Sequence, residues 1–170
     1  MAEVLFRAHA VAAGAGTSLH VHSAGLLDGG WPASDHGVTA MATRGLDTAG
    51  HESRQLTLAM VRSADLLVGM AREHIREAVL LAPDRFFRMY TLKELIRRGE
   101  QAGARAPDQA VDEWLLKVHA GRTHGHLLGR SDDDDVADPI GRSKSHYERT
   151  AAELDDLTRR LVALLWPGGD

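Results

Sequence analysis

Apolar side chains return every three or four residues along most of this chain, which is the spacing of one face of an α-helix. Gly45, Gly99 and Gly121 follow three of these stretches and Pro83 follows a fourth, as expected of residues that end helices. Spacing and boundary residues together predict seven helices, over residues 4–12, 34–44, 57–63, 72–81, 92–98, 108–120 and 145–166. Residues 122–137 lack this spacing, and we expect them to form a polar loop.

Three short segments show strand patterns instead. Residues 18–24 alternate polar and apolar side chains, residues 64–70 form a continuous apolar run, and residues 86–90 are short and aromatic. Because helices separate these segments, we expect an α/β fold with three layers, in which helices cover a small parallel sheet through right-handed connections. A doubly wound fold ordinarily begins with a strand, whereas this chain begins with a helix, so we expect one strand to be missing before Met1.

The length and composition are those of one ordinary globular domain, spanning residues 1–170. The chain has 20 Lys and Arg residues against 24 Asp and Glu residues, and this balance argues against nucleic acid or an anionic membrane surface as partner. No apolar run approaches the roughly 20 residues that span a bilayer, and Glu3, Arg7 and His9 interrupt the stretch where a signal peptide is apolar. We therefore expect a cytoplasmic protein.

The sequence contains no cysteine, which excludes disulfides, thiolate metal sites and thiol chemistry from these residues. His119, His124 and His126 lie near four consecutive aspartates, residues 132–135, but their spacing matches no metal signature. We expect these residues to form a solvated loop, and we expect neither a metal nor an organic cofactor.

Six segments resemble, in order and spacing, parts of one enzyme family. They are MAEVLFR at residues 1–7, SAG at 23–25, GLDTAGHESR at 45–54, ADLLVGM at 64–70, YTLKEL at 90–95, and DPIG at 138–141 with Tyr147 after it. The family they resemble is that of the low-molecular-weight phosphotyrosine protein phosphatases, which also includes thioredoxin-linked arsenate reductases. The resemblance covers nearly the whole chain and implies the family's α/β fold, with the first strand absent from this chain.

The resemblance also implies a mechanism. In the family, a cysteine thiolate in a C-x5-R loop attacks a phosphate monoester, while backbone amides at a helix N-terminus and the arginine hold the phosphate oxygens. By position, Asp138 is the general acid that protonates the leaving group, and Ser23 and His51 support the phosphate loop. The implied substrate is a phosphotyrosine protein or a small aryl phosphate, and no cofactor takes part.

These three residues also have ordinary structural interpretations. Asp138 precedes a proline and is typical of a turn, while His51 suits a turn or a helix end. Ser23 is compatible with a hydroxyl that satisfies a backbone group at the end of a strand. The residue types alone leave a phosphate-loop role and a purely structural role open.

The sequence departs from the family at the catalytic centre. The family's first strand and C-x5-R loop would precede Met1, and no other cysteine replaces the nucleophile, so we expect the chain as given to be inactive. One explanation is a start site upstream, in which case the natural protein is an active phosphatase. The alternative is an inactive remnant or a protein that binds phosphorylated ligands. Arsenate reduction is disfavoured, because that chemistry requires further cysteines.

Overall fold

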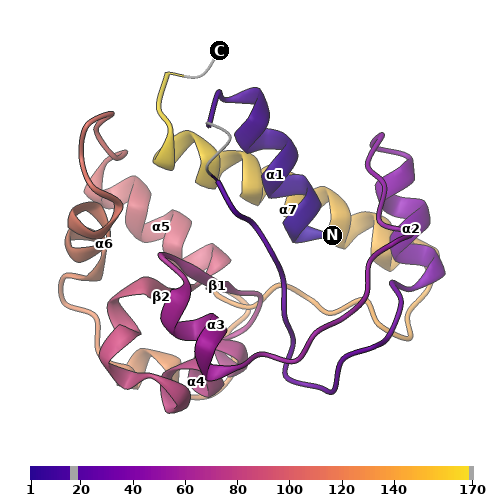
Figure 1. Cartoon of the computed structure of the whole chain (residues 1–170), viewed down its shortest axis with the longest axis horizontal. Coiled ribbons are helices and arrows are strands. Elements are labelled where there is room, and N and C mark those ends of the chain that lie inside the picture. The colour runs from indigo at the N-terminus through magenta and orange to yellow at the C-terminus, as the bar shows by residue number, and fades with distance from the viewer. Residues whose placement is uncertain (16–18, 169–170) are drawn as a thin grey trace. The chain divides into compact units, whose positions relative to one another are not determined.

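A computed structural model of the chain describes residues 1–15 and 19–168 (Figure 1). The chain divides into two compact units. The helical unit contains Met1–Gln55, Ala137–Ala163 and Gly168, and the sheet unit contains Leu56–Val136 with Leu164–Pro167.

The sheet unit is built on two parallel strands, β1 (Leu67–Gly69) and β2 (Met89–Thr91). Their register pairs Leu67 with Met89, Val68 with Tyr90 and Gly69 with Thr91. The connection between them runs through α4 (Arg72–Leu81) and a short 3-10 helix, η1 (Pro83–Arg88). A small parallel sheet connected by helices confirms the predicted α/β class.

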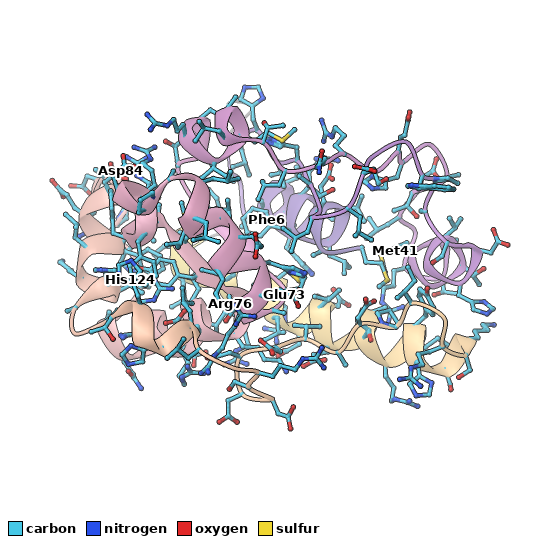
Figure 2. All side chains as sticks on the ribbon, turned by 90° about the horizontal axis from the view of Figure 1, so that it is seen from below. Phe6, Met41, Glu73, Arg76, Asp84 and His124 are labelled. Atoms are coloured by element: carbon cyan, nitrogen blue, oxygen red, sulfur yellow. The ribbon has the colours of Figure 1, made fainter. Side chains whose placement is uncertain are left out.

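The remaining helices of the sheet unit pack around the two strands, α4 and η1. They are α3 (Leu58–Ser63), α5 (Leu92–Ala102), α6 (Val111–His119) and the 3-10 helix η2 (His124–Leu127). The hydroxyl groups of Thr57 and Thr91 cap the N-termini of α3 and α5, as expected of threonine at that position. Helices α5 and α6 lie side by side (Figure 1). Arg76 of α4, labelled in Figure 2, donates to the carbonyls of Leu127 and Gly129 at 2.7 and 3.0 Å and so fixes the end of η2.

The helical unit contains α1 (Ala2–Ala12), α2 (Asp35–Ala42) and most of α7 (Lys144–Leu165). A side-chain hydrogen bond links α1 to α7, because His9 Nε2 lies 2.7 Å from Asp155 Oδ1. Arg44, just after α2, approaches the other oxygen of Asp155 at 3.9 Å. Helices α1 and α7 confirm the helices predicted at both ends of the chain. The Asp155 carboxylate on α7 connects this helix to α1 and to the residue after α2. No helix of the described residues is both long enough and apolar enough to cross a membrane.

The strand predicted over residues 18–24 is wrong for the part that the structure describes. Ser18 lies outside the described residues, and residues 19–24 form an extended segment without a strand. A strand requires a neighbour that pairs with its backbone along its length. Here only an isolated bridge joins Gly25 to Gln55, through the bond from the Gly25 amide to the Arg54 carbonyl at 2.8 Å.

Two other boundaries differ from the prediction. The aromatic segment 86–90 is mostly η1, because Pro83 begins a helical turn and the strand starts only at Met89. Helix α5 continues past Gly99 and ends at Ala102, before Gly103, whose φ of +84° favours glycine.

Candidate active site

The first turn of α1 carries a carboxylate that holds two other side chains. Glu3 Oε2 accepts a hydrogen bond from the hydroxyl of Ser23 at 2.6 Å, and Glu3 Oε1 accepts one from Arg7 Nη2 at 2.6 Å. The same Arg7 nitrogen donates to the carbonyl of Val21 at 2.7 Å. These contacts attach the extended segment 19–24 to α1 by side chains, in place of a strand ladder.

The electrostatics of this cluster fix its hydrogen-bond directions. Burial opposes ionisation of Glu3, but hydrogen bonds from Ser23 and Arg7 and the nearby charges of Arg7 and His51 outweigh it and hold the pKa of Glu3 below its ordinary value. Glu3 is therefore a carboxylate at neutral pH and can only accept. Ser23 must donate its hydroxyl proton to Glu3, so its oxygen lone pairs point elsewhere and can accept a backbone N–H.

His51 reaches the same cluster from a turn. Its backbone amide donates to the carbonyl of Thr48 at 3.1 Å, and its side chain is half-buried and close enough to Glu3 to act on its charge. The hydroxyl of Thr48 is buried and has no hydrogen-bond partner among the described residues. Of the two predicted loop-supporting residues, Ser23 is hydrogen-bonded to Glu3, and His51 lies near enough for its charge to act on the pKa of Glu3.

Asp138 lies in an exposed turn before α7. Its Oδ1 accepts a hydrogen bond from the backbone amide of Ile140 at 2.9 Å. The turn closes with a bond from the Arg142 amide to the Pro139 carbonyl at 2.9 Å, and Gly141 adopts the φ of +70° that its third position requires.

Asp138 belongs to the same unit as Ser23 and His51, but the structure does not bond it to them. Within the described parts of the chain, its hydrogen bond lies inside its own turn. Glu3 and Arg7 belong to no motif that predicts a site role from the sequence. Their spacing of four residues, typical of an ion pair on one helix face, was the available signal.

The histidines and aspartates considered for a metal have other contacts. His124 stacks on Phe86 with ring centroids 4.3 Å apart, and His126 Nδ1 lies 3.1 Å from the Thr123 hydroxyl. Asp134 accepts from Arg72 Nε at 2.8 Å. In the portion of the chain that the structure describes, no group of three or more His, Cys, Asp or Glu side chains is placed to hold a metal ion.

Comparison with known proteins gives a consistent result. Residues 1–113 match the sequence model of the family described as low molecular weight phosphotyrosine protein phosphatase. The protein-arginine-phosphatase of Bacillus subtilis (strain 168) is 30% identical over 166 residues, which cover 97% of this chain and 87% of that protein.

Solved structures agree with the sequence match. The low-molecular-weight protein tyrosine phosphatase from T. tengcongensis superposes with a TM-score of 0.69 and 26% identity, over 96% of this chain and 88% of that one. A mutant of YwlE from Bacillus subtilis superposes with a TM-score of 0.66 and 25% identity, over 95% of this chain and 85% of that one.

Proposed function

Because the chain belongs to the low-molecular-weight phosphotyrosine protein phosphatase family, we propose that it forms most of a phosphomonoesterase of the protein-tyrosine-phosphatase type. The observation that carries the proposal is the cluster at the first turn of α1, where Ser23 donates to Glu3 at 2.6 Å and His51 lies near enough for its charge to act on the pKa of Glu3. In this family the phosphate loop directly precedes that helix, which supports the proposed role of both side chains in holding the loop. Asp138 and Pro139 supply the family's acid motif.

The proposed chemistry has two steps. A thiolate attacks phosphorus, the bond from phosphorus to the leaving oxygen breaks, and Asp138 gives its proton to that oxygen. A water molecule then attacks the phosphocysteine, Asp138 takes its proton, and the thiolate and inorganic phosphate are released. Ser23 accepts an N–H of the phosphate loop while its own O–H donates to the Glu3 carboxylate.

The nucleophile is not among these 170 residues, since they contain no cysteine. The proposal therefore places the Cys and the phosphate-binding Arg on polypeptide outside them, in a C-x5-R loop that leads into α1. A strand before that loop would also supply the backbone partners that the extended segment 19–24 needs to become a strand. On this proposal the 170 residues alone are inactive.

Two substrate classes are candidates. A phosphotyrosine protein or small aryl phosphate follows from the family. Phosphoarginine is the second, because the relative from Bacillus subtilis is a protein-arginine-phosphatase. In both classes the departing oxygen or nitrogen needs a proton, so the role of Asp138 is the same.

The test compares two purified proteins, this 170-residue chain and a form extended upstream in frame through a C-x5-R segment. Circular dichroism and thermal melting first establish that each is folded, and hydrolysis of p-nitrophenyl phosphate and of a phosphoarginine peptide is then measured. Activity confined to the extended form supports the proposal, and the better substrate identifies the class. Two folded but inactive forms would reject catalysis and favour the alternative of an inactive protein that binds phosphorylated ligands.

A further inference from the structure

One buried hydroxyl of α7 bonds to the backbone next to Asp138. Thr150 is only 6% exposed, and its Oγ1 donates to the carbonyl of Ala137 at 3.3 Å. Buried threonines in helices commonly donate to the carbonyl four residues earlier in the same helix. Thr158, two turns later in α7 and also buried, does so with Leu154 at 2.7 Å. Thr150 instead uses its hydroxyl to hold a segment outside the helix.

The bond to Ala137 constrains Asp138 through the peptide group. Because the atoms of a peptide bond lie in one plane, holding the Ala137 carbonyl also orients the N–H and Cα of Asp138. On the other side, Pro139 disfavours the helical region for the residue before it. The Ile140 amide fixes Asp138 Oδ1 at 2.9 Å. The backbone of Asp138 is therefore restrained on both sides and its side chain at one oxygen.

We propose that Thr150 is a positioning residue for the general acid Asp138, acting through the Ala137 carbonyl. The inference rests on the proposed function, in which Asp138 protonates the leaving group. With Oδ1 held by the Ile140 amide, the proton to be transferred sits on Oδ2, and its position depends on the backbone that Thr150 orients. Small displacements of a catalytic group reduce rates substantially.

The surroundings of Thr150 allow its bond to Ala137 to be removed without disrupting the fold. Ala137 is exposed, so its carbonyl can bind water when the Thr150 hydroxyl is removed. Thr150→Val keeps the shape of the side chain and puts a methyl group in a buried place, which should leave the fold intact. Thr158→Val is the matched control, because it removes an equally buried hydroxyl from the same helix without touching the Asp138 segment.

The first measurement is hydrogen exchange at the Ile140 amide in this 170-residue chain, followed by NMR. Losing one hydrogen bond that restrains the turn should accelerate exchange at Ile140 about 5-fold in Thr150→Val. Thr150→Ser, which keeps the hydroxyl, and Thr158→Val should exchange like the unmodified chain. Unchanged exchange in Thr150→Val would overturn the inference without any assay of activity.

The second measurement uses kcat/KM of the extended form with two aryl phosphates. A poor leaving group needs the proton most, so Thr150→Val should lower kcat/KM roughly 10-fold for phenyl phosphate and less than about 3-fold for p-nitrophenyl phosphate. Thr150→Ser should restore both values. An equal loss for both substrates, or the same loss in Thr158→Val, would overturn the positioning role. If Asp138→Ala itself shows no leaving-group effect, the general-acid assignment fails instead.

Discussion

Arg122 and Glu94 form a bidentate ion pair inside the sheet unit, with Nε 2.7 Å from Oε1 and Nη2 2.9 Å from Oε2. The side chain of Arg122 is fully buried and that of Glu94 is 5% exposed. The guanidinium carbon also lies 4.1 and 4.2 Å from the ring centroids of Phe86 and Tyr90. This arginine therefore joins the loop after α6 to η1, β2 and α5.

Replacing Arg122 should destabilise the protein even when the charge is kept. In Arg122→Lys, the single ammonium group cannot form both bonds to Glu94 or stack on the two rings. The buried Glu94 carboxylate then loses part of the hydrogen bonding that offsets the cost of its burial. We expect the free energy of unfolding to fall by roughly 2–4 kcal/mol in urea titrations. The control is Arg159→Lys, in an exposed pair with Asp156, where a change below about 0.5 kcal/mol is expected. Equal effects of the two changes would contradict the structural role of Arg122.

At Gly99, helix propensity and core packing have opposite effects on a replacement by alanine. Alanine inside a helix is favoured over glycine by about 1 kcal/mol. A Cβ atom at residue 99 would lie 2.9 Å from Leu164 Cδ1 and 3.0 Å from Cζ2 of the Trp114 ring, which cannot yield easily. Overpacking of this kind costs about 1–3 kcal/mol, so Gly99→Ala should be destabilising by about 1 kcal/mol in spite of its propensity. At Gly50 an added Cβ atom would meet no other group within 4 Å, so Gly50→Ala should be nearly neutral. If Gly99→Ala instead stabilises the protein, the core around residue 99 adjusts to the extra methyl group.

The helices could be predicted because their signals are local. The spacing of apolar residues and glycines such as Gly45 and Gly121, which adopt φ of +71° and +72°, mark helices without knowledge of the rest of the fold. The strand over residues 18–24 could not be judged in this way, because a strand depends on a neighbour that is distant in sequence. The burial of Arg122 cannot be predicted from the polar pattern of residues 122–137 for the same reason, since it depends on Glu94, Phe86 and Tyr90.

The candidate site could be predicted only through family resemblance. Ser23, His51 and Asp138 occupy positions that resemble the family's motif, and the structure bonds Ser23 to Glu3. Nothing in the sequence spacing predicts this bond, because an extended segment of unknown path separates Ser23 from α1. Thr150 carried no signal, because a threonine in a helix looks the same whether it bonds to its own helix or to Ala137.

Asp138→Ala should impair catalysis in the extended form. Without a proton donor the leaving oxygen departs as an anion, so hydrolysis of aryl phosphates should slow by about 10² to 10⁴. Steady-state rates for the unmodified and altered proteins measure the effect. Asp132→Ala, at an exposed position in the preceding loop, is the control and should retain the original rate. A normal rate in Asp138→Ala would remove this residue from the acid role.

His51→Ala should weaken phosphate binding more than folding. The side chain is half-buried and near enough to Glu3 for its charge to act on the pKa of Glu3, and losing one interaction with a charged group corresponds to roughly a 10-fold change in binding. Inhibition by inorganic phosphate and the melting temperature are measured in parallel on the extended form. The control is His22→Ala, because His22 is exposed on the segment that carries Ser23. If His51→Ala lowers the melting temperature but leaves inhibition unchanged, its role is structural.

Asp134 should make the protein sensitive to acid. Its side chain is 5% exposed and lies 2.7 Å from both Arg72 Nη2 and Arg97 Nη2. Burial opposes its ionisation, but the hydrogen bonds and charges of Arg97 and Arg72 outweigh burial and hold the pKa of Asp134 below its ordinary value of 3.8. The unfolded chain therefore binds a proton at higher pH than the folded protein does. The stabilisation is complete above the unfolded pKa and is lost as the pH falls through the folded pKa.

Asp134→Asn separates this contribution from other effects of acid. The amide keeps the shape but not the charge, so the free energy of unfolding near neutral pH should fall by roughly 2–4 kcal/mol. Between about pH 6 and about pH 3, the free energy of unfolding of this variant should fall by less than that of the unmodified protein, because the carboxylate that takes up the proton is gone. Urea titrations at several pH values measure both quantities, with the exposed Asp133→Asn as control. If the free energy of unfolding of Asp134→Asn falls as steeply with acid as that of the unmodified protein, other carboxylates dominate the acid sensitivity. The ion pairs of Asp134 with Arg72 and Arg97 would then contribute nothing to that sensitivity.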